Sequence, residues 1–245
     1  MDYDIDIHTH ILSSLDDGPE NMDQSLEMAR KFVDHGTRRI FATPHGYSPY
    51  FHADKRAIIN TLDIFTDLLS SNGIALEVRI GMEIRIHLEL LAHILSNEAM
   101  CLGDKRAGER FLLLELPTRE WPQKLLEVIY ELRIRHITPI IAHPERNFAV
   151  MQHPAIVSDA VSEGAWLQIT AGSCTGAFGS NCLKTAKRLA SEGWIHLVAS
   201  DAHDLVHRAP GLLRAWEVIH LSWRLPEVVT VCRENAETIW QSAVS

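Results

Sequence analysis

Histidine and aspartate recur at short spacing near both ends of the chain. The N-terminal stretch Asp-Ile-Asp-Ile-His-Thr-His contains Asp6, His8 and His10, and a later Ser-Asp-Ala-His stretch supplies Asp201 and His203. An extended strand repeats every two residues, so His8 and His10 are expected on the same side of the chain. Converging imidazole and carboxylate groups bind metal ions that activate water as hydroxide. The pattern therefore predicts metal-dependent hydrolysis, with in-line phosphoryl displacement as the reaction.

Four further residues of the same kinds lie between these two motifs, namely His45, Glu83, Glu115 and His143. His45 taken alone is more often a hydrogen-bonded structural residue. Glu115 is different, because a carboxylate within Phe-Leu-Leu-Leu-Glu-Leu-Pro would be costly to bury without a cation or hydrogen bonds. The set exceeds the needs of one ion, so two or three ions are expected, with Glu83 as a candidate bridge. A ligand set without thiolate suits Mn, Fe or Zn.

Two arginines, Arg146 and Arg208, closely follow two of these histidines in sequence. A guanidinium group stays charged and presents paired donors to phosphate oxygens, so we expect both to bind a substrate phosphate at the mouth of the metal site. The alternative is that they form surface ion pairs with Glu145 and Asp204.

The elements that must position these groups alternate between short β-branched runs and longer amphipathic segments, the pattern of repeated βα units with parallel strands. The expected strands are Tyr3–Ile7, Arg39–Ala42, Leu76–Ile80, Phe111–Leu116, Pro139–Ala142, Trp166–Ile169 and Ile195–Ala199. The expected helices are Met22–Val33, Ala57–Leu69, Gln123–Arg135, Ala155–Glu163, Cys182–Ala190, Leu212–Ser222 and Glu227–Gln241. Nearly every strand delivers a His, Asp or Glu at its C-terminal end, where α/β barrels build active sites. The sequence thus predicts an α/β protein of seven βα units, a number close to that of a closed TIM-like barrel.

Composition narrows the protein class. The chain has 245 residues, a length at which α/β barrels commonly form one domain, so residues 1–245 are expected to be a single domain. No apolar run approaches the roughly 20 residues of a membrane span, and the N-terminus does not resemble a signal peptide. The net charge of −9, without a basic cluster, disfavours nucleic acid as a partner. Four cysteines without CxxC spacing fit reduced thiols in the cytoplasm. The oligomeric state is not indicated.

A series of motifs along nearly the whole chain resembles the polymerase and histidinol phosphatase (PHP) superfamily, and within it the bacterial manganese-dependent tyrosine-protein phosphatases of capsular or exopolysaccharide loci. The motifs are DIHTHIL, LDDGPEN, ATPH, GMEIRI, LLLELP, IAHPER, QITAGS, GAFG, ASDAH and ENAE. The resemblance implies a distorted seven-stranded barrel, Mn²⁺ as the metal and a phosphotyrosine protein as the substrate. The implied partner is the tail of a bacterial tyrosine kinase of polysaccharide assembly.

The same resemblance implies a role for each metal ligand. It assigns one ion to His8, His10, Glu83 and Asp201, a second ion to Glu83, Glu115 and His143, and a third ion to Asp17, His45 and His203. Arg146 and Arg208 would engage the phosphate. Asp16 is adjacent to Asp17, and the alignment of the DDGP motif favours Asp17 as the ligand.

Three points stay open in the sequence. The superfamily core also supports hydrolysis of small metabolites such as histidinol phosphate, because a fold does not fix a substrate. A non-catalytic regulator that binds a phosphoprotein is a further alternative, although every implied ligand is present. The loop of residues 46–52 contains Tyr47, Tyr50 and Phe51, which form either a rim for an aromatic phosphoester or ordinary loop packing.

Overall fold

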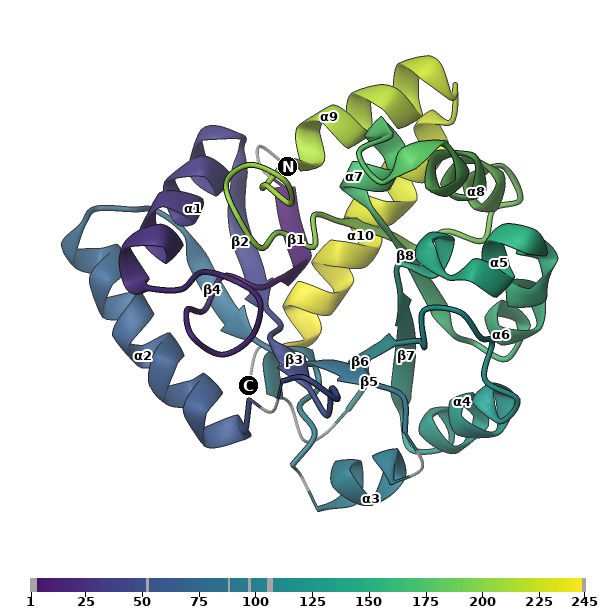
Figure 1. The fold of residues 1–245 in the computed structure, drawn as a ribbon, viewed down its shortest axis with the longest axis horizontal. Helices are drawn as coiled ribbons and strands as arrows, with labels where there is room; N and C mark the ends of the chain where they lie inside the picture. Colours follow the sequence, from purple (N-terminus) through teal and green to yellow (C-terminus); the bar gives the residue numbers. More distant parts are fainter. Residues whose placement is uncertain (1–3, 52, 88, 97, 105–107, 244–245) are drawn as a thin grey trace.

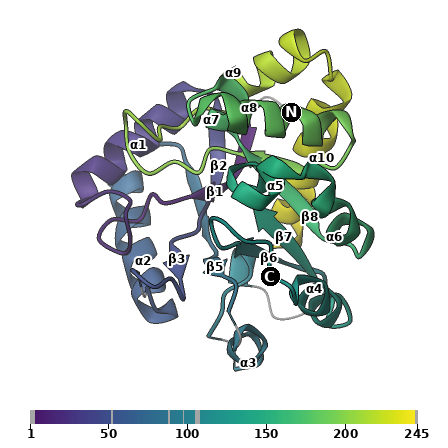
Figure 2. The same ribbon diagram turned by 45° about the vertical axis from the view of Figure 1, so that its right-hand side comes forward.

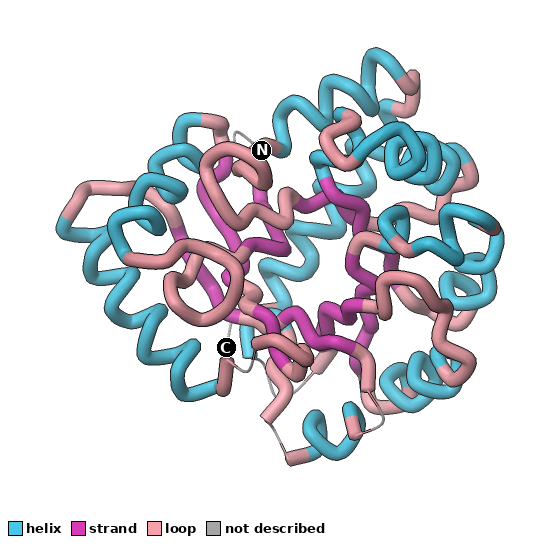
Figure 3. Tube along the Cα trace, in the orientation of Figure 1, coloured by secondary structure: helices cyan, strands magenta, loops and turns pink. Residues whose placement is uncertain are grey.

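The computed structural model describes residues 4–51, 53–87, 89–96, 98–104 and 108–243. Strands lie around the centre of the molecule, most helices lie outside them, and α10 crosses the middle of the view (Figure 3). The same arrangement is visible in the ribbon and in the view turned by 45° (Figures 1 and 2). The fold is therefore α/β, with the sheet layer enclosed by helices.

The strands form two parallel sheets. Their bounds are β1 Asp4–Thr9, β2 Thr37–Ala42, β3 His45–Gly46, β4 Glu77–Ile80, β5 Glu83–Arg85, β6 Arg110–Glu115, β7 Ile137–Ala142, β8 Trp166–Thr170 and β9 Leu197–Ala199. One sheet has the order β1-β2-β4 and the other β3-β5-β6-β7-β8-β9, and every pairing is parallel. Parallel pairing brings the C-terminal ends of the strands to one end of each sheet, which is the end that can gather their terminal side chains.

Backbone hydrogen bonds also connect the two sheets. The amide of Asp201 donates to the carbonyl of His8 at 3.0 Å, and the amide of His10 donates to the carbonyl of Ala202 at 2.8 Å. Within the larger sheet, the amide of Glu83 donates to the carbonyl of Pro44 at 3.2 Å and extends the pairing of β3 with β5. The residues that follow β1 and β9 are thus held side by side.

The helices alternate with the strands. The α-helices are α1 Met22–Asp34, α2 Lys55–Ser71, α3 Leu90–Leu95, α4 Leu125–Arg133, α5 Phe148–Gln152, α6 Ser158–Ser162, α7 Ala171–Thr175, α8 Gly179–Ser191, α9 Leu212–Glu217 and α10 Pro226–Ser242. Short turns of 3-10 helix occur at Leu102–Asp104, Pro144–Arg146 and Pro154–Val157, and a π-helical turn at Val218–Ser222. Within the part of the chain that the structure describes, no helix is both long enough and apolar enough to cross a membrane.

Local sequence explains where the elements begin and what they bury. The side chain of Asn21 accepts a hydrogen bond from the amide of Gln24 and so caps α1, and Pro226 occupies the first turn of α10. Strands β1 and β7 are buried along their whole length, as expected of parallel strands covered on both faces. Ile7, Phe41 and Leu113 belong to the apolar cluster between the strands and α10.

The structure confirms the parallel α/β arrangement and each of the expected strands, with shifted ends. Tyr3, the first residue of the expected N-terminal strand, lies outside the described residues. The short strands β3 and β5 and the helices α3, α5 and α7 were not expected, because segments of two to six residues are too short to display a periodic pattern. The hydrogen-bonded ladders form two sheets, so a single closed barrel of seven strands is not shown.

Candidate metal centre

The strand ends bring the expected ligand residues to one region. The following elements supply them: β1 and the residue after it supply His8 and His10, β3 supplies His45, β5 supplies Glu83, β6 supplies Glu115, the segment after β7 supplies His143, and the segment after β9 supplies Asp201 and His203. Asp17 comes from the loop before α1. All of these residues except His143 fall into three groups, and within each group the ligand atoms lie within 4.8 Å of one another.

The first group consists of His8, His10, Glu83 and Asp201, all fully buried. The Nε2 atoms of the two histidines lie 3.1 Å apart. Each of these nitrogens lies 3.3–3.4 Å from Oε2 of Glu83 and from Oδ1 of Asp201. Ligand atoms held about 2.0–2.1 Å from one ion in a tetrahedron lie about 3.3–3.4 Å from one another. The spacing therefore fits a single metal ion enclosed by these four atoms.

The second ring nitrogens of His8 and His10 face acceptors, which leaves the Nε2 atoms as the metal-binding atoms. Nδ1 of His8 lies 2.9 Å from Oε1 of Gln168, and Nδ1 of His10 lies 2.6 Å from Oδ2 of Asp16. A histidine that donates its Nδ1 hydrogen presents an Nε2 lone pair, and such outer hydrogen bonds also fix the orientation of the ring.

The second group contains Asp17, His45, His203 and again His10. Oδ1 of Asp17 lies 3.2 Å from Nε2 of His203 and 3.5 Å from Nε2 of His45. Nδ1 of His203 lies 2.9 Å from the carbonyl oxygen of Asp201, which leaves its Nε2 free. His10 has only Nε2 to offer and that atom belongs to the first group, so the second group reduces to Asp17, His45 and His203.

The third group joins Glu83 and Glu115 with His45. His143, which the family resemblance assigns to the same ion as Glu83 and Glu115, has its Nε2 atom 2.9 Å from Oε1 of Glu83, on the carboxylate oxygen opposite the first group. Glu83 therefore uses Oε2 toward His8 and Oε1 toward His143. This division is the geometry expected of a carboxylate shared between two ions.

Unpaired buried atoms provide a test of whether this region suits cations. Nδ1 of His45, Oε2 of Glu83, Oδ1 of Asp201 and Nε2 of His203 are buried and make no hydrogen bond. Each of the four lies 3.0–3.3 Å from an oppositely charged or chargeable atom of the same groups without making a hydrogen bond, and buried polar atoms in that state cost free energy that a bound cation would offset. The residues present thus fit bound metal ions.

The electrostatics of the region agree with this fit. Burial and the neighbouring Glu83 carboxylate raise the pKa of Glu115 to about 7. Burial alone would raise the pKa of Asp201 and lower that of His8, but their mutual attraction and that of Glu83 for His8 reverse both shifts. Burial and the nearby His10 lower the pKa of His203 to about 4, which keeps it in the neutral form that binds metal. Clustered carboxylates that repel one another favour a cation between them.

Two ligand residues have an unusual backbone conformation. His143 and Asp201 have positive φ angles of 34° and 54°, in the left-handed region that non-glycine residues seldom adopt. His143 follows directly after β7, and Asp201 is the second residue after β9. The turn redirects their side chains from the strand toward the shared region, and the strain is of the kind found at functional sites.

Arg146 and Arg208 converge on one oxygen of this region. Nη1 of Arg146 donates to Oδ2 of Asp201 at 2.6 Å, and Nη2 of Arg208 donates to the same oxygen at 2.7 Å. Arg208 also donates to Asp17 at 3.3 Å. No hydrogen bond joins either guanidinium to Glu145 or Asp204 among the contacts of the described side chains, so the expected alternative of surface ion pairs with those two residues is not observed. Both arginines lie beside the metal ligands.

Several supporting residues were not assigned a role from the sequence. Gln168 orients His8, and Asp6 accepts hydrogen bonds at 3.1 Å from the amide of Ser200, which ties β1 to the segment after β9. The buried Glu145 accepts from the amide of Thr170 at 2.9 Å and from the hydroxyl of Ser173, and so anchors the turn that carries Arg146. The sequence feature that could have indicated these roles is the presence of a polar residue within a strand or turn that is expected to be buried.

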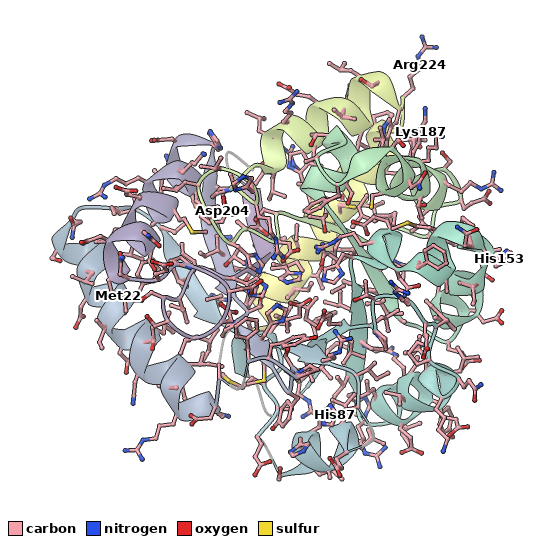
Figure 4. All side chains as sticks on the ribbon, viewed as in Figure 1. Met22, His87, His153, Lys187, Asp204 and Arg224 are labelled. Carbon is pink, nitrogen blue, oxygen red and sulfur yellow. The ribbon has the colours of Figure 1, made fainter. Side chains whose placement is uncertain are left out.

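The aromatic loop divides between two environments. The ring of Phe51 stacks on His45 with centroids 5.8 Å apart, whereas Tyr47 stacks on His87, which is labelled in Figure 4, with centroids 4.9 Å apart. Tyr50 is 83% exposed. His52 lies outside the described residues. The loop thus contributes one ring to the metal region and packs another away from it.

Comparison with known proteins gives consistent matches. Residues 4–241 match the family described as capsular polysaccharide synthesis, CpsB/CapC. The chain is 35% identical over 237 residues to the tyrosine-protein phosphatase YwqE of Bacillus subtilis (strain 168), which covers 96% of this chain and 91% of the relative. It is 32% identical over 204 residues to the putative tyrosine-protein phosphatase CapC of Staphylococcus aureus, which covers 83% of this chain and 78% of the relative.

A solved structure is also similar. It comes from the crystal structures of YwqE from Bacillus subtilis and CpsB from Streptococcus pneumoniae, which are called unique metal-dependent tyrosine phosphatases. The TM-score is 0.89 at 35% sequence identity, with 97% of this chain and 94% of that chain covered.

The adjacent residues Asp16 and Asp17 have different contacts and should respond differently to mutation. Asp17→Ala should lower the metal content by one ion per chain, because it removes a ligand of the second group. Asp16→Ala should keep the number of ions but weaken binding by about 10–100-fold, the usual effect of losing an outer hydrogen bond to a metal-bound histidine. Elemental analysis and calorimetric titration measure both quantities. The reverse pattern would identify Asp16 as the ligand.

Proposed function

The chain belongs to the CpsB/CapC family of capsular polysaccharide synthesis proteins, and from this premise we propose that it is a metal-dependent protein-tyrosine phosphatase. The observation that carries the proposal is the buried group of His8, His10, Glu83 and Asp201, whose ligand atoms have the spacing of one coordination sphere. Relatives with 35% and 32% identity are named tyrosine-protein phosphatases, which indicates the reaction.

We assign the metal ligands by the contacts of each side chain. The first ion would be held by His8, His10, Glu83 and Asp201, and a third by Asp17, His45 and His203. For the second ion we keep the set that the family resemblance implies, Glu83, Glu115 and His143, and the contact between His143 and Glu83 supports it. Mn²⁺ is the proposed metal, with Fe or Zn as alternatives, because the donors are imidazole and carboxylate without thiolate. When bound, the ions supply a water of lowered pKa and neutralise charge on the phosphoryl group.

The protein's own residues orient the groups around this chemistry. Gln168 and Asp16 hold the rings of His8 and His10 by their Nδ1 atoms. Arg146 and Arg208, whose side chains are 28% and 23% exposed, stand at the edge of the region and present guanidinium donors to the phosphate. Their shared contact with Asp201 places both donors beside the metal ligands before a substrate binds.

The proposed substrate is phosphotyrosine in a protein, and the proposed partner is the tail of a bacterial tyrosine kinase of polysaccharide biosynthesis. The family's description as capsular polysaccharide synthesis supports this choice. The alternative of a small metabolite such as histidinol phosphate is less well supported, because the relatives are named for tyrosine-protein phosphatase activity. A non-catalytic regulator is disfavoured because all nine proposed ligands are present.

Three further features complete the proposal. We propose that residues 1–245 form one PHP domain in which the two parallel sheets act together as a distorted barrel, supported by the hydrogen bonds between the ends of β1 and β9. We propose a cytoplasmic location, supported by four buried cysteines that form no disulfide. Neither nucleic acid nor membrane insertion is part of the proposal.

Activity should depend on metal and not on a cysteine. Burial raises the pKa of the Cys232 thiol to about 12 and that of Cys174 well above its ordinary value, and the H-C-x5-R signature of thiolate phosphatases is absent from the sequence. A chelator should abolish hydrolysis of a phosphotyrosine peptide, Mn²⁺ should restore it, and iodoacetamide added to the native protein should have little effect. Initial rates on histidinol phosphate should be lower than those on the phosphotyrosine peptide. A chelator-resistant, thiol-sensitive enzyme would contradict the proposal.

Replacement of either arginine should affect catalysis and spare the metals. Arg146→Ala and Arg208→Ala should each lower kcat/KM by a factor on the order of 10²–10³, the usual effect of removing one strong transition-state donor. The corresponding lysine variants should recover only part of the lost kcat/KM, since an ammonium group keeps the charge but not the paired donors. Metal content should stay near that of the unmodified protein, and Arg188→Ala on α8 serves as the control.

Normal kinetics in both alanine variants would exclude these two residues as the phosphate clamp. The next candidate would then be Arg85, which donates to Glu115 at 3.1 Å.

A further inference from the structure

A hollow of about 460 Å³ lies beside the metal ligands, between α7, the loop of residues 204–211 and α9. Helices α7 and α9 pack against each other, and the loop that contains Asp204 precedes α9 (Figures 1 and 4). The walls that matter here are formed by Phe178, Val206, Arg208, Leu213, Arg214 and Glu217. The proposed metal and phosphate ligands leave most of this hollow unused.

Two contacts connect the hollow to the proposed phosphate site. Arg208 lines the hollow and donates to Oδ2 of Asp201 at 2.7 Å, and its Nε atom is buried without a hydrogen-bond partner. Phe178 also lines the hollow, and the guanidinium carbon of Arg146 lies 4.6 Å from the centroid of its ring. A substrate whose phosphate lies at these two arginines therefore has the hollow within reach of the groups next to its phosphate.

The wall formed by Phe178 is held in place by packing. A Cβ atom added to Gly172 would lie 2.7 Å from Cε2 of Phe178, so only glycine allows the ring to rest where it does. Phe178 belongs to the Gly-Ala-Phe-Gly motif and Gly172 to α7. The ring lies between this glycine and the guanidinium of Arg146, which indicates a preformed surface.

The lining of the hollow contains a cationic side chain, Arg214, in addition to Arg208, which is already paired with Asp201 and Asp17. The lining also contains one acidic residue, Glu217. Arg214 is exposed and forms no ion pair within the described part of the chain. Val206 and Leu213, which are 79% and 51% exposed, add apolar surface. A chain segment that carries an acidic and an apolar side chain complements this lining.

We propose that this hollow binds the segment of the substrate protein next to the phosphotyrosine and prefers an acidic side chain there, paired with Arg214. The inference rests on the proposed phosphatase function and adds a sequence preference to it. The acidic residue would be recognised by the Arg214 guanidinium, and apolar neighbours would pack on Val206 and Leu213. The flanking segment takes no part in the reaction, so the preference should appear in KM rather than in kcat.

The test uses the full chain with Mn²⁺ and three phosphotyrosine peptides that differ only in the residues flanking the phosphotyrosine, which are glutamates, glutamines or lysines. The values of kcat/KM should fall in that order, with steps of up to about fivefold, the scale of one partly exposed ion pair. Arg214→Glu should reverse the order. Lys187→Glu makes the same change of charge on α8, outside the lining of the hollow (Figure 4), and should keep the order of the unmodified protein.

Ratios between peptides are compared within each variant, so loss of active protein does not affect them. Equal kcat/KM for all three peptides, or a shift in Arg214→Glu no larger than that in Lys187→Glu, would overturn the inference and leave the phosphatase function intact. Failure of the Mn²⁺-loaded protein to hydrolyse any of the peptides would instead overturn the proposed function.

Discussion

Glu83 and Asp201 are fully buried carboxylates, and the rest of the site is arranged around the cost of removing their charges from water. The imidazoles of His8 and His10 lie between them, and two guanidinium groups approach Asp201 from the outer side. Even so, one oxygen of each carboxylate makes no hydrogen bond. Bound cations would satisfy these two carboxylate oxygens. The burial of Glu83 and Asp201 is thus connected directly to metal binding.

The fold meets this requirement through the ends of its parallel strands. Strand β1 and the segment after β9 are joined by backbone hydrogen bonds, so His8 and Asp201 arrive at the same place although they are distant in sequence. Left-handed turns at His143 and Asp201 redirect these side chains inward. Gln168 and Asp16 then fix the histidine rings from behind. Strand pairing therefore sets the positions of these residues, the turns set the directions of their side chains, and the hydrogen bonds set the orientation of the ligand atoms.

The sequence predicted the parts of this arrangement in which residues repeat at a fixed spacing, or in which a charged residue within an apolar strand would be unfavourable to bury. The alternation of His8 and His10 and the strand-end acids indicated a metal-binding region, and the runs of β-branched residues indicated parallel strands. Strands β3 and β5 were missed because two or three residues cannot display a period. Gln168 was missed because a single amide in an apolar strand has no distinctive spacing. Asp16 and Asp17 differ only in the direction of their side chains, which adjacent positions in a sequence do not reveal.

The role of Glu83 as a shared ligand is tested most directly by anomalous diffraction from crystals grown with Mn²⁺. Two peaks are predicted on opposite oxygens of its carboxylate, each about 2.0–2.2 Å away. One should also lie beside His8, His10 and Asp201, and the other beside His143 and Glu115. Manganese peaks elsewhere in the molecule, with the Glu83 carboxylate in contact only with the histidines that surround it, would contradict this arrangement.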